Sequence, residues 1–85
     1  MSFKVVYTRS AVKDIKKLDK VAKKQIKKRI ELYSKRPLFH SRKLTDVRIG
    51  GYRWRVGSYR VVFDIKGKTI VVLRAGHRRE IYRRR

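Results

Sequence analysis

The spacing of apolar residues changes about halfway along the chain. Two stripes with helical spacing come first, with apolar positions three or four residues apart. They consist of Ala11, Ile15 and Leu18, and of Ala22, Ile26, Ile30 and Tyr33. Thr8 or Ser10 supplies a cap for the first helix, a break follows at residues 19–20, and the second helix is expected to run to Lys35. Pro37 ends it, because the residue before a proline avoids helical dihedrals.

Segments rich in β-branched and aromatic residues flank the two helices, as is typical of strands. They cover residues 3–8, 52–56, 61–65 and 70–73. Residues 38–49 show no clear period and are expected to be irregular. The order of strand, two helices and three strands predicts one α+β domain over residues 1–85. We expect a mostly antiparallel sheet of about four strands, with the two N-terminal helices packed on one face.

The first hairpin carries arginines that oppose one another. Alternation puts Arg53 and Arg55 on one face of their strand, and a two-residue turn at Gly57-Ser58 pairs Arg55 with Arg60. Like charges directly opposite each other destabilise a sheet, and an anion between them would remove the repulsion. The alternative is a solvated edge strand, with Arg60 forming an ion pair with Asp64 on the same face.

The charge of the chain points to a polyanion as its partner. Lys and Arg number 27 against six Asp and Glu, which gives a formal net charge of +21. Nucleic acid ranks first, an acidic protein fits the same charge, and an anionic membrane ranks third. The residues expected to attract RNA or the ribosome are Lys16, Lys17, Lys23, Lys24, Lys27, Lys28, Arg42 and Lys43. For the helix lysines, the alternative is a merely solvated surface.

Other kinds of chemistry find little support in the composition. The chain has no cysteine, so it has no disulfide and no cysteine-based zinc site. The few acids are scattered, and His40 and His77 lack matched partners, so neither a metal nor a cofactor is expected. No signal peptide or membrane span is visible, which makes a cytoplasmic protein the default expectation.

Arginine, tyrosine and histidine remain as candidates for chemistry. Arginine donates two hydrogen bonds to a phosphate at once, and several arginines stabilise the extra charge of its transition state. RNA cleavage by the 2′-hydroxyl needs alignment, charge stabilisation and proton transfer, but no metal. Tyr82 among arginines would have its phenolate favoured, and His77 is an alternative acid or base. The alternative for Tyr82 is simple packing on the sheet. The candidate catalytic set is Arg53, Arg55, Arg60, Arg78 and Tyr82, with His77 possible.

The segments 51–63 (GYRWRVGSYRVVF) and 74–82 (RAGHRREIY) resemble the RelE/ParE superfamily of toxins, and RelE most of all. The resemblance implies a β-α-α-β-β-β fold with a possible short C-terminal helix. It also implies a ribosome-dependent endonuclease that cleaves mRNA in the A site by 2′-hydroxyl attack, without metal. The implied partners are mRNA on the ribosome, rRNA and an acidic RelB-like antitoxin, in a toxin–antitoxin heterotetramer.

The family's functional positions match the candidate arginines and Tyr82. Where the RelE type has lysines, this chain has Arg53 and Arg55, and a guanidinium does not readily give up a proton. The role of base therefore falls to Tyr82 or His77. The ParE branch shares the fold, targets DNA gyrase and usually lacks the full catalytic set. A non-catalytic binding protein, such as a gyrase inhibitor or an RNA-binding factor, is thus the alternative function.

Overall fold

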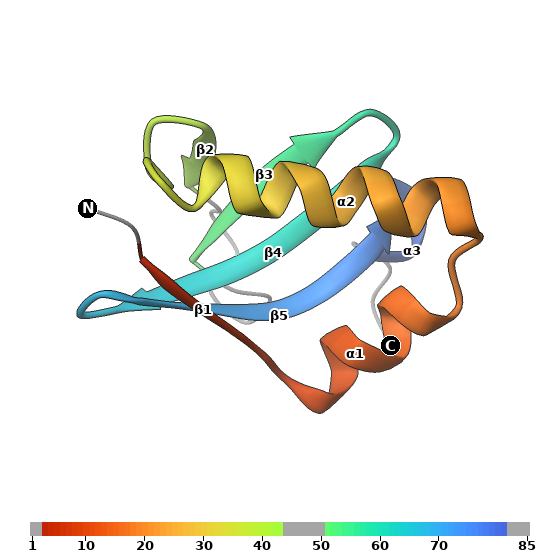
Figure 1. Cartoon of the computed structure of the whole chain (residues 1–85), viewed down its shortest axis with the longest axis horizontal. Helices are drawn as coiled ribbons and strands as arrows, with labels where there is room; N and C mark the ends of the chain where they lie inside the picture. Colours follow the sequence, from red (N-terminus) through yellow and green to blue (C-terminus); the bar gives the residue numbers. More distant parts are fainter. Residues whose placement is uncertain (1–2, 44–50, 82–85) are drawn as a thin grey trace.

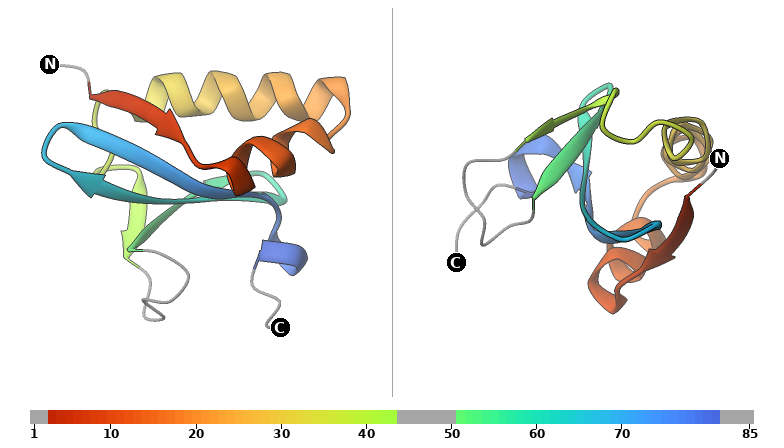
Figure 2. Two further views of the ribbon diagram at one scale, coloured as in Figure 1. Left: turned by 90° about the horizontal axis from the view of Figure 1, so that it is seen from below. Right: turned by 90° about the vertical axis from the view of Figure 1, so that its left-hand side faces the viewer.

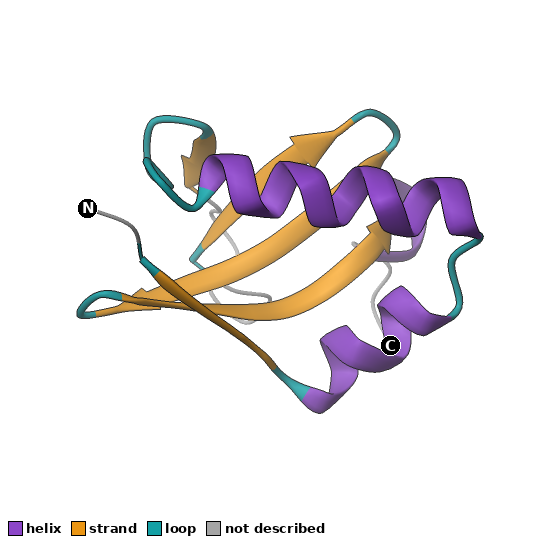
Figure 3. Cartoon of the chain, viewed as in Figure 1, coloured by secondary structure: helices purple, strands orange, loops and turns teal. Residues whose placement is uncertain are grey.

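The computed structural model describes residues 3–43 and 51–81, which form one five-stranded sheet and three helices (Figure 1). The strands are β1 (Lys4–Tyr7), β2 (Ser41–Lys43), β3 (Tyr52–Val56), β4 (Tyr59–Lys66) and β5 (Thr69–His77). The helices are α1 (Arg9–Lys16), α2 (Lys20–Tyr33) and α3 (Arg78–Ile81). Figure 3 shows how the helices and strands follow one another along the chain.

The sheet has the order β1-β5-β4-β3-β2 and confirms the predicted α+β class. β1 pairs with β5 in parallel, and the other three pairings are antiparallel. The sheet has one strand more than the expected four, because β2 forms within the segment predicted to be irregular. β2 is three polar residues long and is held by its register with β3, so it has no strand pattern of its own.

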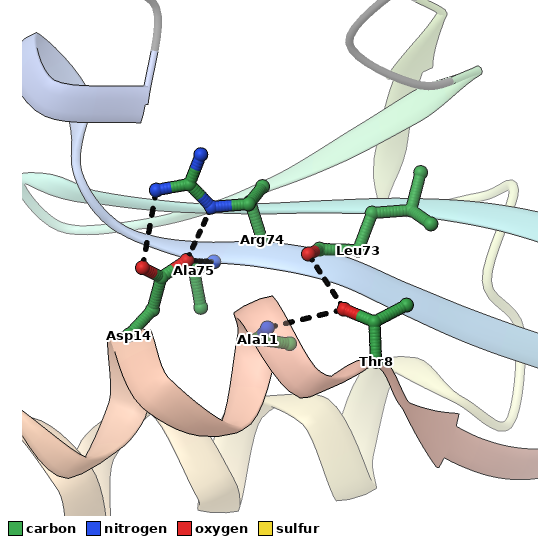
Figure 4. Close-up of polar contacts among 6 residues, drawn as sticks. All are labelled: Thr8, Ala11, Asp14, Leu73, Arg74 and Ala75. Atoms are coloured by element: carbon green, nitrogen blue, oxygen red, sulfur yellow. Dashed lines mark hydrogen bonds and ion pairs between the residues drawn. The ribbon is translucent and has the colours of Figure 1, made fainter.

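Both long helices begin at the polar caps that their sequences offer. The Thr8 Oγ1 accepts a hydrogen bond from the Ala11 N–H at 3.1 Å and donates one to the Leu73 carbonyl at 2.9 Å (Figure 4). Thr8 rather than Ser10 is therefore the cap of α1. Asp19 caps α2 by accepting from the Ala22 N–H at 2.8 Å. α2 ends at Tyr33, two residues before the predicted end.

The core lies between α2 and the sheet, and both α1 and α2 are on this side (Figure 2). Trp54 is fully buried, and its ring centroid is 4.1 Å from that of Phe63. Its indole N–H donates to the Pro37 carbonyl at 3.1 Å, which ties the chain after α2 to β3. This hydrogen bond satisfies the indole N–H, which would otherwise be buried without an acceptor.

A second tie joins α1 to β5. The Asp14 carboxylate accepts from the Arg74 Nε at 2.6 Å and Nη2 at 3.1 Å, and from the Ala75 N–H at 3.0 Å (Figure 4). The hydrogen bond to Asp14 raises the pKa of the Arg74 guanidinium above its ordinary value. These bonds hold the C-terminal half of β5, which leads into α3.

Replacing Asp14 with alanine should lower the free energy of unfolding by about 1–3 kcal/mol, because three donors lose a largely buried acceptor. Urea denaturation followed by Trp54 fluorescence measures this. Glu80→Ala, at an exposed acid, is the matched control and should change stability by less than about 0.5 kcal/mol. Equal midpoints for Asp14→Ala and wild type would contradict the structural role of the tie.

Candidate functional site

Arginines from three adjacent strands share the sheet face that points away from α2. In the register, Arg42 lies opposite Arg53, and Arg55 lies opposite Arg60. Directly opposed residues in an antiparallel pair point to the same side, and these alternate with buried Trp54 on the other side. The predicted pair of Arg55 and Arg60 is confirmed. We call these four residues the arginine face.

The four arginines of this face differ in exposure. Arg42 and Arg55 are exposed and Arg53 is half-buried, whereas the Arg60 side chain is buried with 5% of its surface exposed. The Arg60 Nη1 donates to the carbonyls of Gly57 and Tyr59, each at 2.9 Å. A buried guanidinium held by carbonyls is a fixed positive charge rather than a mobile one.

Asp64, the acid that the sequence suggested as a partner for Arg60, makes a different contact. Its Oδ1 accepts a hydrogen bond from the Gly51 N–H at 2.6 Å. Asp64 therefore holds the start of β3 in place. The hydrogen bonds of the Arg60 Nη1 go instead to the turn between β3 and β4.

α3 folds back next to Arg60. Gly76 lies opposite Arg60 in the register, and a Cβ at residue 76 would lie 3.5 Å from the Ile81 Cδ1. Ile81 is buried, so it packs where the missing side chain leaves room. The Arg78 N–H donates to the Ser58 carbonyl at 3.0 Å, and the Arg78 side chain is exposed. The start of α3 is thus fixed to the β3–β4 turn at one end of the arginine face, on the side of the sheet away from α1 and α2 (Figure 2).

The structure does not bring His77 into this group. His77 lies opposite Tyr59, with ring centroids 6.0 Å apart, on the face that carries Trp54. Its Nδ1 accepts a hydrogen bond from the Arg79 N–H at 3.3 Å. Tyr82 lies outside the described residues. Lys43 is placed by its backbone in β2, opposite Tyr52.

The lysines predicted to attract RNA are exposed and belong to the helical side of the molecule. They are Lys16 and Lys17 at the end of α1, and Lys23, Lys24, Lys27 and Lys28 on α2. The arginine face and the lysine-bearing helices are therefore on opposite sides of the sheet. Long-range attraction by these lysines is compatible with that separation, whereas direct contact with the same phosphate is not.

An apolar groove between α1 and α2 was not foreseen from the sequence. It has a volume of about 410 Å³ and is lined by Tyr7, Val12, Ile15, Ile26 and Ile30, with Lys16, Lys23 and Lys27 beside them. Burial, and to a lesser extent Glu31, raises the pKa of the Tyr7 hydroxyl, so it is neutral at physiological pH. Apolar residues outside the two stripes, Tyr7 and Val12, were the signal that could have revealed this groove.

The described residues also show neither a cluster of metal ligands nor a membrane-spanning helix. Within residues 3–43 and 51–81, no three His, Asp or Glu side chains gather as ligands for a metal ion. In the same residues, no helix has the length and apolar character needed to cross a membrane.

Chemically, the arginine face offers a fixed charge at Arg60 and exposed guanidinium groups on the strands beside it. Such an arrangement binds an anion and stabilises negative charge that develops on it. A phosphodiester is the anion that suits planar, two-pronged donors.

Comparison with known proteins places this geometry in a family. Residues 5–82 match the family model described as the ParE toxin of type II toxin–antitoxin systems. Toxin RelE3 of Methanocaldococcus jannaschii is 36% identical over 83 residues, covering 93% of this chain and 94% of that protein.

Two solved structures support the same assignment. The RelBE2 toxin–antitoxin complex of Mycobacterium tuberculosis contains a chain that is similar with a TM-score of 0.81 and 27% identity, covering 92% of this chain and 100% of that one. The RelB–RelE complex of Methanococcus jannaschii contains a chain that is similar with a TM-score of 0.71 and 32% identity. The match covers 91% of this chain and 94% of that one. The chain therefore belongs to the ParE/RelE family of toxins from type II toxin–antitoxin systems.

Proposed function

We propose that this toxin is an endoribonuclease that cleaves mRNA in the ribosomal A site, in the cytoplasm, and thereby inhibits translation. The observation that supports this most is the opposed pair of Arg55 and Arg60 on the arginine face, with α3 anchored beside it. Two guanidinium groups directly opposite each other repel, and this repulsion opposes folding. A phosphate between them turns the repulsion into binding.

In the proposed reaction, the 2′-oxygen of the mRNA attacks the adjacent phosphorus. A bond from the 2′-oxygen to phosphorus forms as the bond to the 5′-oxygen breaks, which leaves a 2′,3′-cyclic phosphate and a 5′-hydroxyl. The base takes the proton of the 2′-hydroxyl, and the leaving 5′-oxygen takes a proton from water. Because the nucleophile belongs to the substrate, we expect no metal or cofactor to be required.

The residues divide these tasks between them. Arg60 supplies a fixed charge, while Arg53, Arg55 and the exposed Arg78 contact the phosphate and stabilise its transition state. Tyr82 follows directly after Ile81, which packs on Gly76 opposite Arg60, and we assign it the role of base. His77 lies on the other face of the sheet, which favours Tyr82 over it.

Primer extension on ribosome-bound mRNA tests the proposed activity. Adding the toxin should create new 5′ ends within the codon in the A site, and the same mRNA without ribosomes should stay intact. Uncut mRNA on ribosomes, under conditions in which translation nonetheless stops, would refute the proposal.

The name of the matching family model supports a second candidate, a ParE-type inhibitor of DNA gyrase. The same protein sample can be added to a gyrase supercoiling assay. Inhibition of supercoiling without new mRNA ends would favour this candidate, in which the arginine face binds the target but cuts nothing.

We further propose that an acidic RelB-like antitoxin holds the toxin inactive, in a heterotetramer. The similar solved toxins were determined as RelB–RelE complexes. Two surfaces of this chain suit such a partner: the arginine face, and the apolar groove between α1 and α2 with its adjacent lysines. An amphipathic acidic segment would bury apolar side chains in the groove and place carboxylates near Lys16, Lys23 and Lys27.

Replacing Val12 with aspartate should weaken antitoxin binding at least about tenfold, because it puts a carboxylate in the groove against an acidic partner. Val12 is already 40% exposed, so the fold should tolerate the change. Isothermal titration of the toxin with its antitoxin measures the affinity. Val21→Asp, at a 76% exposed residue that does not line the groove, is the matched control. Equal affinities for the two variants would argue against the groove as a contact.

A further inference from the structure

Phe39, in the turn between α2 and β2, is 70% exposed, although phenylalanine is normally buried. The Arg36 guanidinium carbon lies 4.4 Å from the centroid of its ring. The His40 ring meets the Phe39 ring edge-on at 5.0 Å and stacks on Tyr33 at 4.4 Å. An exposed aromatic ring is thus flanked by a cation and supported by two further rings.

The backbone under Phe39 is held by hydrogen bonds. The Phe39 N–H donates to the Arg36 carbonyl at 3.1 Å, and the Arg36 N–H donates to the Tyr33 carbonyl at 3.1 Å. Pro37 is tied to the core through its carbonyl, which accepts from Trp54. The ring therefore stays at the surface because its turn is fixed there.

The position of this turn connects it to the arginine face. Residues 39 and 42 are three positions apart, so their Cα atoms are separated by no more than about 11 Å. Arg42, at the centre of β2, lies opposite Arg53. The turn that carries Phe39 therefore adjoins β2, the edge strand of the sheet, and a strand of nucleic acid that passes around this edge from Arg42 can reach the Phe39 ring.

We propose that Phe39 is a stacking platform for an unpaired RNA base, with Arg36 contributing its guanidinium to the same site. This rests on the proposed function in that it requires RNA as the partner. Aromatic rings beside cations are the common means of binding single strands without reading sequence, because every base has a flat face to stack. The surrounding positive charge makes an RNA strand a better occupant than another apolar protein surface.

The test compares two oligonucleotides with the same number of phosphates, a 12-residue oligouridylate and its abasic counterpart. Fluorescence anisotropy with the antitoxin-free toxin gives both affinities. Wild type should prefer the oligomer with bases by at least about fivefold, and Phe39→Leu should remove that preference without weakening abasic binding. Phe39→Trp should keep or increase it.

Val21→Ser is the control variant, because Val21 is an equally exposed apolar residue on α2. It should bind both oligomers as wild type does. The stacking site is refuted if the Phe39→Leu variant keeps the preference for the oligomer with bases, or if the substitution weakens the binding of both oligomers equally. No ribosome or cleavage enters these measurements, so they test the site even if the toxin cuts no mRNA.

A photo-crosslinker at position 39 then distinguishes the sources of the base. With p-benzoylphenylalanine there, irradiation on programmed ribosomes should link the toxin to RNA, and primer extension shows whether the link is in rRNA or in mRNA. Either RNA product supports the proposal. Crosslinks to ribosomal protein alone would overturn it.

Discussion

Tyr82→Phe should slow cleavage of ribosome-bound mRNA by at least about 100-fold, the usual contribution of a general acid or base. The substitution removes one hydroxyl and retains the ring, so the fold and the affinity for ribosomes should be unchanged. Guanidinium groups beside a tyrosine favour its phenolate form, and we propose that the arginine face has this effect on Tyr82. Single-turnover cleavage rates at saturating toxin isolate this step from binding.

Tyr52→Phe is the matched control for this prediction. Tyr52 lies in β3, and its ring stacks on Phe63 at 5.7 Å on the core side. Its loss of a hydroxyl should leave the cleavage rate within about twofold of wild type, since it touches none of the reacting atoms. If the Tyr82→Phe variant cleaved mRNA as fast as the Tyr52→Phe variant, Tyr82 would not be the base. If His77→Gln were then slow, the base would be His77.

Arg55→Gln should lower the cleavage rate by about 100- to 1,000-fold, the effect of losing one donor to a developing charge. The same change should not destabilise the fold, because Arg55 is exposed and lies opposite another arginine. Removing the repulsion should stabilise the protein by a few tenths of a kcal/mol up to about 1 kcal/mol. Loss of activity together with equal or greater stability is the signature of a residue kept for function.

Arg60→Gln, on the same face, should differ from Arg55→Gln in its effect on stability. Arg60 is buried and bonds to the carbonyls of Gly57 and Tyr59, so its replacement should cost about 1–3 kcal/mol of stability as well as activity. Urea denaturation and cleavage rates on both variants measure the two effects. Arg55→Lys keeps the charge and should retain much of the activity. A strongly destabilised Arg55→Gln would contradict the assignment of that residue to phosphate binding.

The opposed arginines could be predicted from the sequence because their cause is local. Gly57-Ser58 fixes a two-residue turn, with Gly57 at a φ of +60°, and the register of Arg55 and Arg60 follows from it. The core position of Trp54 follows from the same alternation. Helical spacing likewise placed Ile26 and Ile30 in the core.

Features that depend on distant partners could not be predicted in this way. β2 is three polar residues held by β3, so the pairing of Arg42 with Arg53 has no signal in the local pattern. The tie between Asp14 and Arg74 joins residues 60 positions apart. The exposure of Phe39 depends on how its turn packs, which residue spacing does not encode.

The place of His77 shows how a single irregularity changes a site. Phe63 pairs with Val72 but Val62 pairs with Arg74, so Leu73 is an extra residue in β5. A β-bulge of this kind reverses the alternation beyond it. With regular pairing, His77 would point to the side of Arg60, whereas the bulge puts it opposite Tyr59. Nothing in the local sequence marks the bulge.

Cleavage of ribosome-bound mRNA that carries a single 2′-deoxynucleotide tests the central claim most directly. The substitution is placed at the nucleotide whose 2′-hydroxyl would attack, and the unmodified mRNA is run beside it. We predict that the unmodified mRNA is cut to a fragment with a 5′-hydroxyl and a fragment with a 2′,3′-cyclic phosphate, and that the substituted mRNA is not cut at that position. Equal cleavage of both, or products with 5′-phosphates, would contradict an arginine face that acts through the substrate's own 2′-hydroxyl.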